Sequence, residues 1–219
     1  MIDLHTHTFL SDGALIPSEL ARRAVTAGYK AIAITDHVDH SNIKTVLPGI
    51  VEAAQVLNRY WDIQVLPGVE ITHVPVEVFS ELTGFAREKG ARIVVAHGES
   101  PVEPVIPGTN RAAIQAGVDI LAHPGYITDE DALLAREREV ALELTARAGH
   151  ASGNRHVLDA ARRAGAKLVL NTDTHLPDDL LTREKIDGIF AALDVSEELK
   201  KEILANSAEI VARAVKQGA

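Results

Sequence analysis

Two histidines separated by one residue stand close to the start of the chain, in the segment DLHTHTFLSDG that runs from Asp3 to Gly13. Side chains at positions i and i+2 of a strand point the same way, so His5 and His7 can reach one metal ion. The segment DTH repeats this spacing with Asp173 and His175. Because the chain has no cysteine, any metal must be held by nitrogen and oxygen atoms. The two pairs predict a metal site with imidazole and carboxylate ligands.

Residues of the same types follow most of the apolar runs that we predict to be strands. The runs are Ile2–Leu4, Ala31–Thr35, Ile63–Leu66, Arg92–Ala96, Asp119–Ala122, Val140–Leu144 and Lys167–Leu170. All but the sixth run are followed by metal-ligating residue types, and these are His5, His7, Asp12, His37, Glu70, His97, His123, Asp173 and His175. In a parallel α/β barrel the strands all end on one face, where active sites are built. We therefore expect these side chains to meet at one rim.

The apolar runs also predict the architecture. Continuous stretches of Ala, Val, Ile and Leu are typical of strands that are buried on both faces of a parallel sheet. Amphipathic segments, which we expect to be helices, alternate with the runs, and glycine stands just past four of their ends, at Gly28, Gly90, Gly117 and Gly165. This alternation implies parallel strands joined by right-handed crossovers. Seven such strands favour a distorted (β/α)7 TIM-like barrel, and a doubly wound open sheet is the alternative.

Three further features concern the elements and the domain. Pro17 and Pro48 are expected near helix starts, where the missing N–H costs nothing. Residues 196–217 are expected to form a long amphipathic helix that closes the fold. No linker or low-complexity stretch interrupts the chain, so we expect residues 1–219 to form a single domain.

The composition excludes several classes of partner. The chain has 219 residues, of which 46% are hydrophobic and 24% are charged, as in an ordinary globular protein. The formal net charge of −9 argues against sequence-independent nucleic-acid binding, which depends on Lys and Arg at the phosphates, although the metal chemistry leaves a nuclease as an alternative. No apolar run approaches the roughly 20 residues of a membrane-spanning helix, and no signal-peptide pattern is visible. We expect a cytoplasmic protein with neither a membrane nor a nucleic-acid partner.

The segments DLHTHTFLSDG, TDH, GVE, AHPG and DTH, in this order, resemble the PHP (polymerase and histidinol phosphatase) superfamily. They extend from Asp3 to His175, and the similarity is greatest to the stand-alone phosphoesterases of histidinol-phosphatase type. The resemblance implies a barrel of seven βα units that holds up to three ions of Zn, Mn or Fe and hydrolyses phosphate esters. Its ligand pattern implies His5, His7, Glu70 and Asp173 around one ion, Asp12, His37 and His175 around a second, and His97 and His123, with Glu70 bridging, around a third.

The charges of such a centre suggest the substrate. Three divalent cations bring six positive charges against three negative charges from Asp12, Glu70 and Asp173, and a bridging hydroxide removes one more. The remaining two match a phosphomonoester dianion. We therefore expect the hydroxide between the metals to hydrolyse a small phosphorylated metabolite that is similar to histidinol phosphate.

Candidates for substrate binding follow the sixth predicted strand, which has no assigned ligand. Arg147 and Arg155 stand on either side of the segment AGHASGN and are candidates for binding phosphate, with a solvated surface position as the alternative for each. His150 in the same segment is a candidate proton donor to the leaving alcohol. The Pro- and Gly-rich segment 97–110 is expected to wall the pocket.

Two other functions compete with the phosphoesterase. Barrel amidohydrolases, which cleave C–N bonds, also carry H-x-H on the first strand and Asp on the last. They usually have eight strands and a bridging lysine, whereas Glu70 takes that position here. A metal-binding accessory module without activity is the third hypothesis, and the complete ligand set counts against it.

Overall fold

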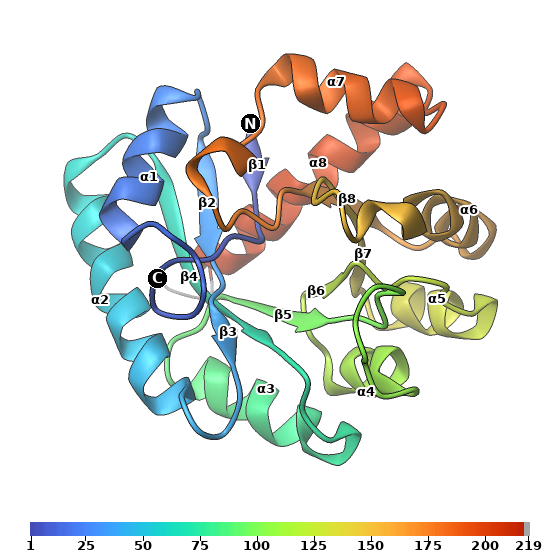
Figure 1. Ribbon diagram of the computed structural model, residues 1–219, viewed down its shortest axis with the longest axis horizontal. Helices are drawn as coiled ribbons and strands as arrows, with labels where there is room; N and C mark the ends of the chain where they lie inside the picture. Colours follow the sequence, from blue (N-terminus) through green and yellow to red (C-terminus); the bar gives the residue numbers. More distant parts are fainter. Residues whose placement is uncertain (217–219) are drawn as a thin grey trace.

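The computed structural model describes residues 1–216, whose strands form one parallel sheet curled into a nearly closed barrel (Figure 1). In this part of the chain the strands are β1 (Ile2–Asp3), β2 (Ala31–Ile34), β3 (His37–Val38), β4 (Gln64–Ile71), β5 (Ile93–His97), β6 (Ile120–Ala122), β7 (Ala141–Thr145) and β8 (Leu168–Asn171). Their order is β1-β2-β4-β5-β6-β7-β8, and each neighbouring pair is parallel. The predicted TIM-like α/β barrel is confirmed.

Strand β3 continues β2 after a two-residue interruption. Both pair with β4 in a single register, since Ile34 lies opposite Pro67 and His37 lies opposite Glu70. The two strands therefore share one position in the sheet. The seven strand positions agree with the seven predicted strands.

The first and last strands meet beyond their ends. Thr6 forms a parallel bridge with Thr174, and the amide of His7 donates to the carbonyl oxygen of Thr174 at 2.8 Å. The amide of Asp173 donates to the carbonyl oxygen of His5 at 3.0 Å. Because these bonds join the two edges of the sheet, the alternative of an open doubly wound sheet is wrong.

Aliphatic side chains fill the interior of the barrel. Those from the strands and the residues next to them are Leu4, Ala33, Leu66, Ile93, Val95, Ile120, Ala122, Ala141 and Val169. Helix α8 (Glu197–Lys216) adds Ile210 and Ala214 and crosses the sheet (Figure 1). Arg213 of α8 donates to Asp119, just before β6, so the helix covers the end where strands begin. The predicted closing helix is confirmed, and Gln217 lies outside the described residues.

The other helices surround the strands (Figure 1). They are α1 (Pro17–Thr26), α2 (Ile43–Tyr60), α3 (Phe79–Glu88), α4 (Thr109–Ala116), α5 (Asp129–Glu137), α6 (Asn154–Ala164) and α7 (Arg183–Ala192). As predicted, Gly117 and Gly165 end α4 and α6 in the left-handed conformation, with φ of 73° and 70°.

The expectation for Pro48 is wrong. Pro17 is the first residue of α1, but Pro48 lies inside α2, which begins at Ile43. The side chain of Asn42, at the N-cap of α2, accepts from the amide of Asp39 and donates to the carbonyl oxygen of His37, so it ties the preceding loop to the start of the helix. The helix tolerates the loss of one backbone hydrogen bond at Pro48.

No helix within residues 1–216 is both long enough and apolar enough to cross a membrane. The single domain over residues 1–219 and the cytoplasmic location stay predictions.

Candidate metal centre

Buried hydrogen bonds fix the strand ends that carry the histidines. Asp3 accepts from the amides of His5 and Thr172 at 3.3 and 3.2 Å and from the Thr172 hydroxyl at 2.5 Å. Thr6 donates its hydroxyl to the carbonyl oxygen of Ala33 at 2.6 Å. Buried polar groups need such partners. These polar residues of the segments DLHTH and NTDTH therefore tie β1 to β2 and β8. The side chains of His5 and His7 are left to face the barrel mouth.

The structure brings all the predicted metal ligands together at this mouth. Their ligand atoms form groups within 4.8 Å, which are His7, Asp12, His37 and His175; His5, His123 and Asp173; His5, His7 and Glu70; and Glu70, His97 and His123. The first, third and fourth of these groups resemble the three ligand sets that the family resemblance implies. The first group contains His7 in addition. The second group differs, because it places His123 beside His5 and Asp173.

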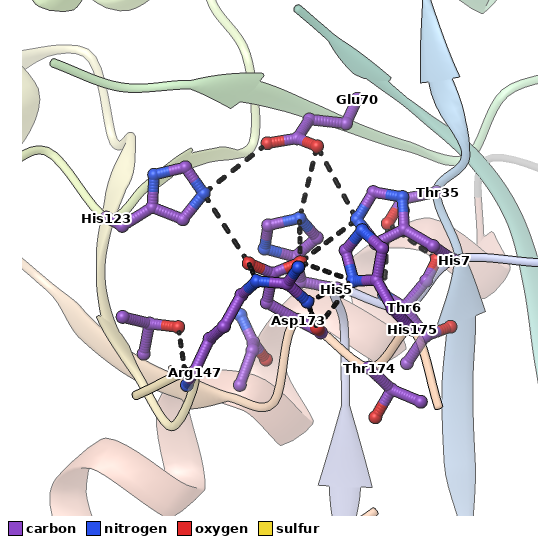
Figure 2. Close-up of polar contacts among 12 residues, drawn as sticks. His5, Thr6, His7, Thr35, Glu70, His123, Arg147, Asp173, Thr174 and His175 are labelled. Carbon is purple, nitrogen blue, oxygen red and sulfur yellow. Dashed lines mark hydrogen bonds and ion pairs between the residues drawn. The ribbon is translucent and has the colours of Figure 1, made fainter. Parts of the chain in front are cut away.

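Glu70, on β4, belongs to two of these groups, and its carboxylate contacts histidines that come from several strands (Figure 2). Its Oε2 is 2.7 Å from Nδ1 of His37, which is also bonded to Thr72. The same oxygen is 3.4 Å from Nε2 of His5 and 3.5 Å from Nε2 of His7. Burial alone would raise the pKa of Glu70, but the neighbouring His37 and His5 hold it well below its usual range. Glu70 is therefore an ionised carboxylate.

Asp173 faces Glu70 across the histidines (Figure 2). Its Oδ1 is 3.2 Å from Nε2 of His7 and 3.7 Å from Nε2 of His5, and its Oδ2 is 3.8 Å from Nε2 of His123. The backbones of Asp173 and His123 have positive φ, 53° and 29°. Such conformations cost about 1–3 kcal/mol each and are found mainly at functional sites.

Many of the ligand-type atoms in the described residues are buried and make no hydrogen bond of good geometry, although some of them lie within ion-pair distance of one another. They are Nε2 of His5, both ring nitrogens of His7, Nδ1 of His123 and both carboxylate oxygens of Glu70. Each unpartnered buried polar group costs roughly 1–3 kcal/mol, and a buried ion costs more. Converging imidazole nitrogens and carboxylate oxygens are the donor set of Zn, Mn and Fe. The residues therefore fit a metal centre.

The protonation of the two N-terminal histidines differs. Burial and the neighbouring His37 lower the pKa of His7 to about 4, so its ring is neutral, as a metal ligand must be. Burial also opposes a proton on His5, but the carboxylates of Glu143 and Glu70 raise its pKa well above the usual value. Carboxylates on two sides of His5 therefore favour positive charge at this position, which a bound cation would supply in place of the ring proton.

Residues 3–213 match the family of PHP domains. The chain belongs to the PHP domain family. An uncharacterized protein of Methanocaldococcus jannaschii is 46% identical over 215 residues, which cover 96% of this chain and 98% of that protein. A probable phosphatase of Shewanella frigidimarina is 30% identical, over 84% of this chain and 82% of that protein.

Two solved structures resemble this PHP domain. Histidinol phosphate phosphatase from Lactococcus lactis, in complex with zinc, L-histidinol and phosphate, has a TM-score of 0.60 at 16% identity and covers 89% of this chain and 94% of its own. A chain of archaeal ribonuclease P with mature tRNA has a TM-score of 0.71 at 17% identity, over 98% and 91%. At these identities the likeness shows the fold alone. The absence of a nucleic-acid partner stays a prediction.

The PHP domain also buries a carboxylate that we did not predict as part of the site. Glu143, on β7, is fully buried, with Oε2 2.8 Å from Nδ1 of His5. The same oxygen accepts from the side-chain amide of Asn171 at 2.9 Å. A carboxylate on Nδ1 turns Nε2 of such a histidine toward a metal. The sequence could have indicated this residue, because a glutamate within the apolar run VALEL is expected to be buried with its strand.

A second missed carboxylate, Asp36, organises the loop after β1. It accepts from the amide and hydroxyl of Thr8, both at 2.8 Å, and from the amide and hydroxyl of Ser11 at 3.0 and 2.7 Å. These bonds hold the turn that carries Asp12. Although the side chain of Asp12 is 55% exposed, its Oδ1 lies 3.3 Å from Nε2 of His175.

The groups open into a cavity of about 370 Å³ whose lining includes Arg147 and His150. Nη1 of Arg147 is 2.6 Å from Nδ1 of His175 and donates to the carbonyl oxygen of Asp173 at 3.2 Å (Figure 2). His150 stacks on His123, with ring centroids 4.2 Å apart. Two of the three residues predicted to meet substrate therefore line this cavity.

Arg155 does not line it, and we correct its expected role. Its Nε donates to Asp159 at 3.1 Å and its Nη1 to the carbonyl oxygen of Leu193 at 3.0 Å. Arg155 lies in the first turn of α6, on its exposed face toward the end of α7. Arg155 therefore has the solvated surface position that we considered as its alternative.

Proposed function

We propose that this PHP domain is a metal-dependent phosphoesterase that hydrolyses a small phosphomonoester. The observation that carries the proposal is the buried cluster of unpartnered imidazole and carboxylate atoms around Glu70, which opens into a cavity beside Arg147. The Shewanella relative named a probable phosphatase and the fold shared with histidinol phosphate phosphatase support the same reaction class.

Two or three divalent ions would be held by the predicted ligands His5, His7, Asp12, His37, Glu70, His97, His123, Asp173 and His175. Such ions, when bound, supply a water that is deprotonated near neutral pH and positive charge for the phosphoryl oxygens. The protein's part is to orient the ligands: Glu143 directs Nε2 of His5, and the carbonyl oxygen of Gly98 directs Nε2 of His97 through a 3.1 Å contact with Nδ1.

Arg147 is the proposed phosphate-binding residue. A histidine that holds a cation through Nε2 keeps its proton on Nδ1. Nδ1 of His175 then donates to the carbonyl oxygen of Asp173, 2.9 Å away, and no longer accepts from Arg147. The guanidinium keeps its hydrogen bond to the carbonyl oxygen of Asp173, and its other N–H groups at the cavity wall can bind phosphoryl oxygens.

Replacing Arg147 with glutamine is expected to raise KM for a phosphomonoester roughly tenfold, because one charge-assisted contact to phosphate is lost. Arg155→Gln is the matched control, since it removes an equal charge outside the cavity and is expected to leave KM unchanged. Steady-state kinetics on both variants, with metal content measured, make the comparison. Equal KM values for the two variants would reject Arg147 as the phosphate ligand.

His150 is the candidate proton donor to the leaving alcohol. Its Nδ1 is 2.6 Å from the hydroxyl oxygen of Ser100, and its Nε2 lies 3.5 Å from Glu103. Burial lowers the pKa of His150 and so favours the neutral ring. A bound phosphate dianion would stabilise the protonated ring, which then donates to the alkoxide as the ester bond breaks.

The function is tested by elemental analysis of the purified protein together with a substrate panel. The panel holds small phosphomonoesters, a dihydroorotate-like cyclic amide and a single-stranded oligonucleotide. We expect bound divalent metal and hydrolysis of phosphomonoesters. Cleavage of the amide alone would favour the amidohydrolase alternative, and metal without any hydrolysis would favour the accessory module.

A further inference from the structure

The segment between β5 and α4 has a fixed base and an exposed tip. At the base, Oε1 of Glu99 accepts from the amides of Gly108 and Asn110 at 2.9 and 3.0 Å. The side-chain oxygen of Asn110 accepts in turn from the amide of Glu99 at 2.9 Å. At the tip, Val102 and Ile106 are about half exposed. The tip is therefore less covered by the rest of the protein than its two ends.

Glu103, in this tip, is held by three imidazoles. Its Oε2 is 3.0 Å from Nε2 of His73 and 3.0 Å from Nε2 of His97, and its Oε1 is 3.5 Å from Nε2 of His150. The hydrogen bond to His97 is the main reason that the pKa of Glu103 falls to about 2. The sequence had indicated only that this segment walls the pocket. The structure shows that it places a carboxylate inside it.

Two of the three imidazoles have an orienting partner besides Glu103. Nδ1 of His97 contacts the carbonyl oxygen of Gly98 at 3.1 Å, and Nδ1 of His150 contacts the hydroxyl oxygen of Ser100 at 2.6 Å. The backbone of His73 has a positive φ of 52°, and its ring centroid lies 4.8 Å from that of His97. If Glu103 left, Nε2 of His97 and Nε2 of His150 would keep these orienting contacts. His73 and His97 together with Glu103 could also hold a metal ion, whereas without Glu103 the imidazoles alone suit an anion.

We propose that His73, His97 and His150 form an oxyanion-binding site, and that Glu103 is a tethered occupant which a phosphate group displaces. The identity of the anion rests on the proposed function. Three nitrogen atoms around one point suit the several oxygens of a phosphate ester, including the bridging oxygen that His150 would protonate, better than the two oxygens of a carboxylate.

The site adjoins the candidate metal centre. His97 belongs to both, and His150 stacks on His123. If His97 binds a cation, its ring carries no extra proton. The positive charge of the cation then attracts the phosphate instead. In either case Glu103 and phosphate compete for one position. Glu103 thereby sets how tightly substrate and product are bound, because the apparent affinity falls with the fraction of molecules in which the site is open.

Calorimetric titration of the purified, metal-loaded protein with inorganic phosphate tests this competition. Glu103→Gln keeps the shape of the side chain and removes its charge. If Glu103 fills the site about nine-tenths of the time, this variant binds phosphate roughly tenfold more tightly than the wild type. Glu88→Gln is the matched control, because Glu88 is exposed at the far end of α3, and we expect no change.

Hydrogen exchange of residues 101–107 gives a second readout that needs no variant. Phosphate is expected to speed exchange of these amides in the wild type, because the tip is released. In Glu103→Gln exchange should already be fast and phosphate should add little. If that variant fails to fold, the wild-type experiment alone decides.

Three results would overturn the proposal: phosphate affinity in Glu103→Gln equal to or below that of the wild type, slower exchange of the tip on adding phosphate, or loss of a metal equivalent in the variant. The last would make Glu103 a metal ligand. If phosphate releases the tip but no phosphomonoester is hydrolysed, the proposed function fails and the anion site stands. If hydrolysis occurs and Glu103→Gln changes nothing, only this proposal fails.

Discussion

Replacing Glu70 with glutamine is expected to lower kcat/KM for phosphomonoesters roughly 10³-fold and to remove at least one metal equivalent. Glu70 is the only described carboxylate within 4 Å of His5, His7, His37 and His123 together. An amide keeps its volume but removes the negative charge and one acceptor from the centre of the cluster. Metal catalysis contributes several kcal/mol of transition-state stabilisation, and about 4 kcal/mol corresponds to this loss in rate.

The measurement is metal content by elemental analysis together with kcat/KM at saturating metal. Glu52→Gln, which removes an exposed carboxylate from α2, is the control and is expected to behave as wild type. Circular dichroism of the Glu70 variant separates loss of metal from loss of the fold. A folded variant with full metal content and activity within a few-fold of wild type would contradict the central role of Glu70.

Replacing Glu143 with glutamine is expected to weaken metal affinity or activity by about 10–100-fold, the usual effect of losing an outer partner of a metal-binding histidine. Its carboxylate contacts Nδ1 of His5 at 2.8 Å and the Asn171 amide at 2.9 Å. Glutamine can still accept one hydrogen bond but no longer offsets charge on the imidazole. Because the ligands themselves remain, excess metal should restore part of the activity.

Competition with a chelating dye measures the metal affinity of this variant. Glu137→Gln, at the exposed end of α5, removes the same charge far from the site and is the control. If metal affinity and kcat/KM are unchanged in Glu143→Gln, the carboxylate of Glu143 does not support the metal-binding role of His5.

Local spacing in the sequence was sufficient to predict the barrel and the cluster of metal-type residues. The pair His5 and His7 obeys the two-residue period of a strand, and so does the pair Asp173 and His175. Parallel strands deliver their C-terminal ends to a single face, so the position of a residue after a strand already predicts where it lies. The helix end at Gly165 could be predicted for the same reason, because it depends only on near neighbours.

Tertiary structure alone decided which residues share a site across long distances in the chain. The contact between His5 and Glu143 joins residues 138 positions apart, and Glu103 reaches His73 from an irregular segment whose path no periodicity describes. Arg147 and Arg155 are alike in type and setting, yet one lies at the cavity wall and the other faces outward from α6. Local patterns determine the period and direction of an element. Which side of it meets a distant segment depends on the packing of the whole barrel, and that packing assigns each charged side chain to the cavity or to solvent.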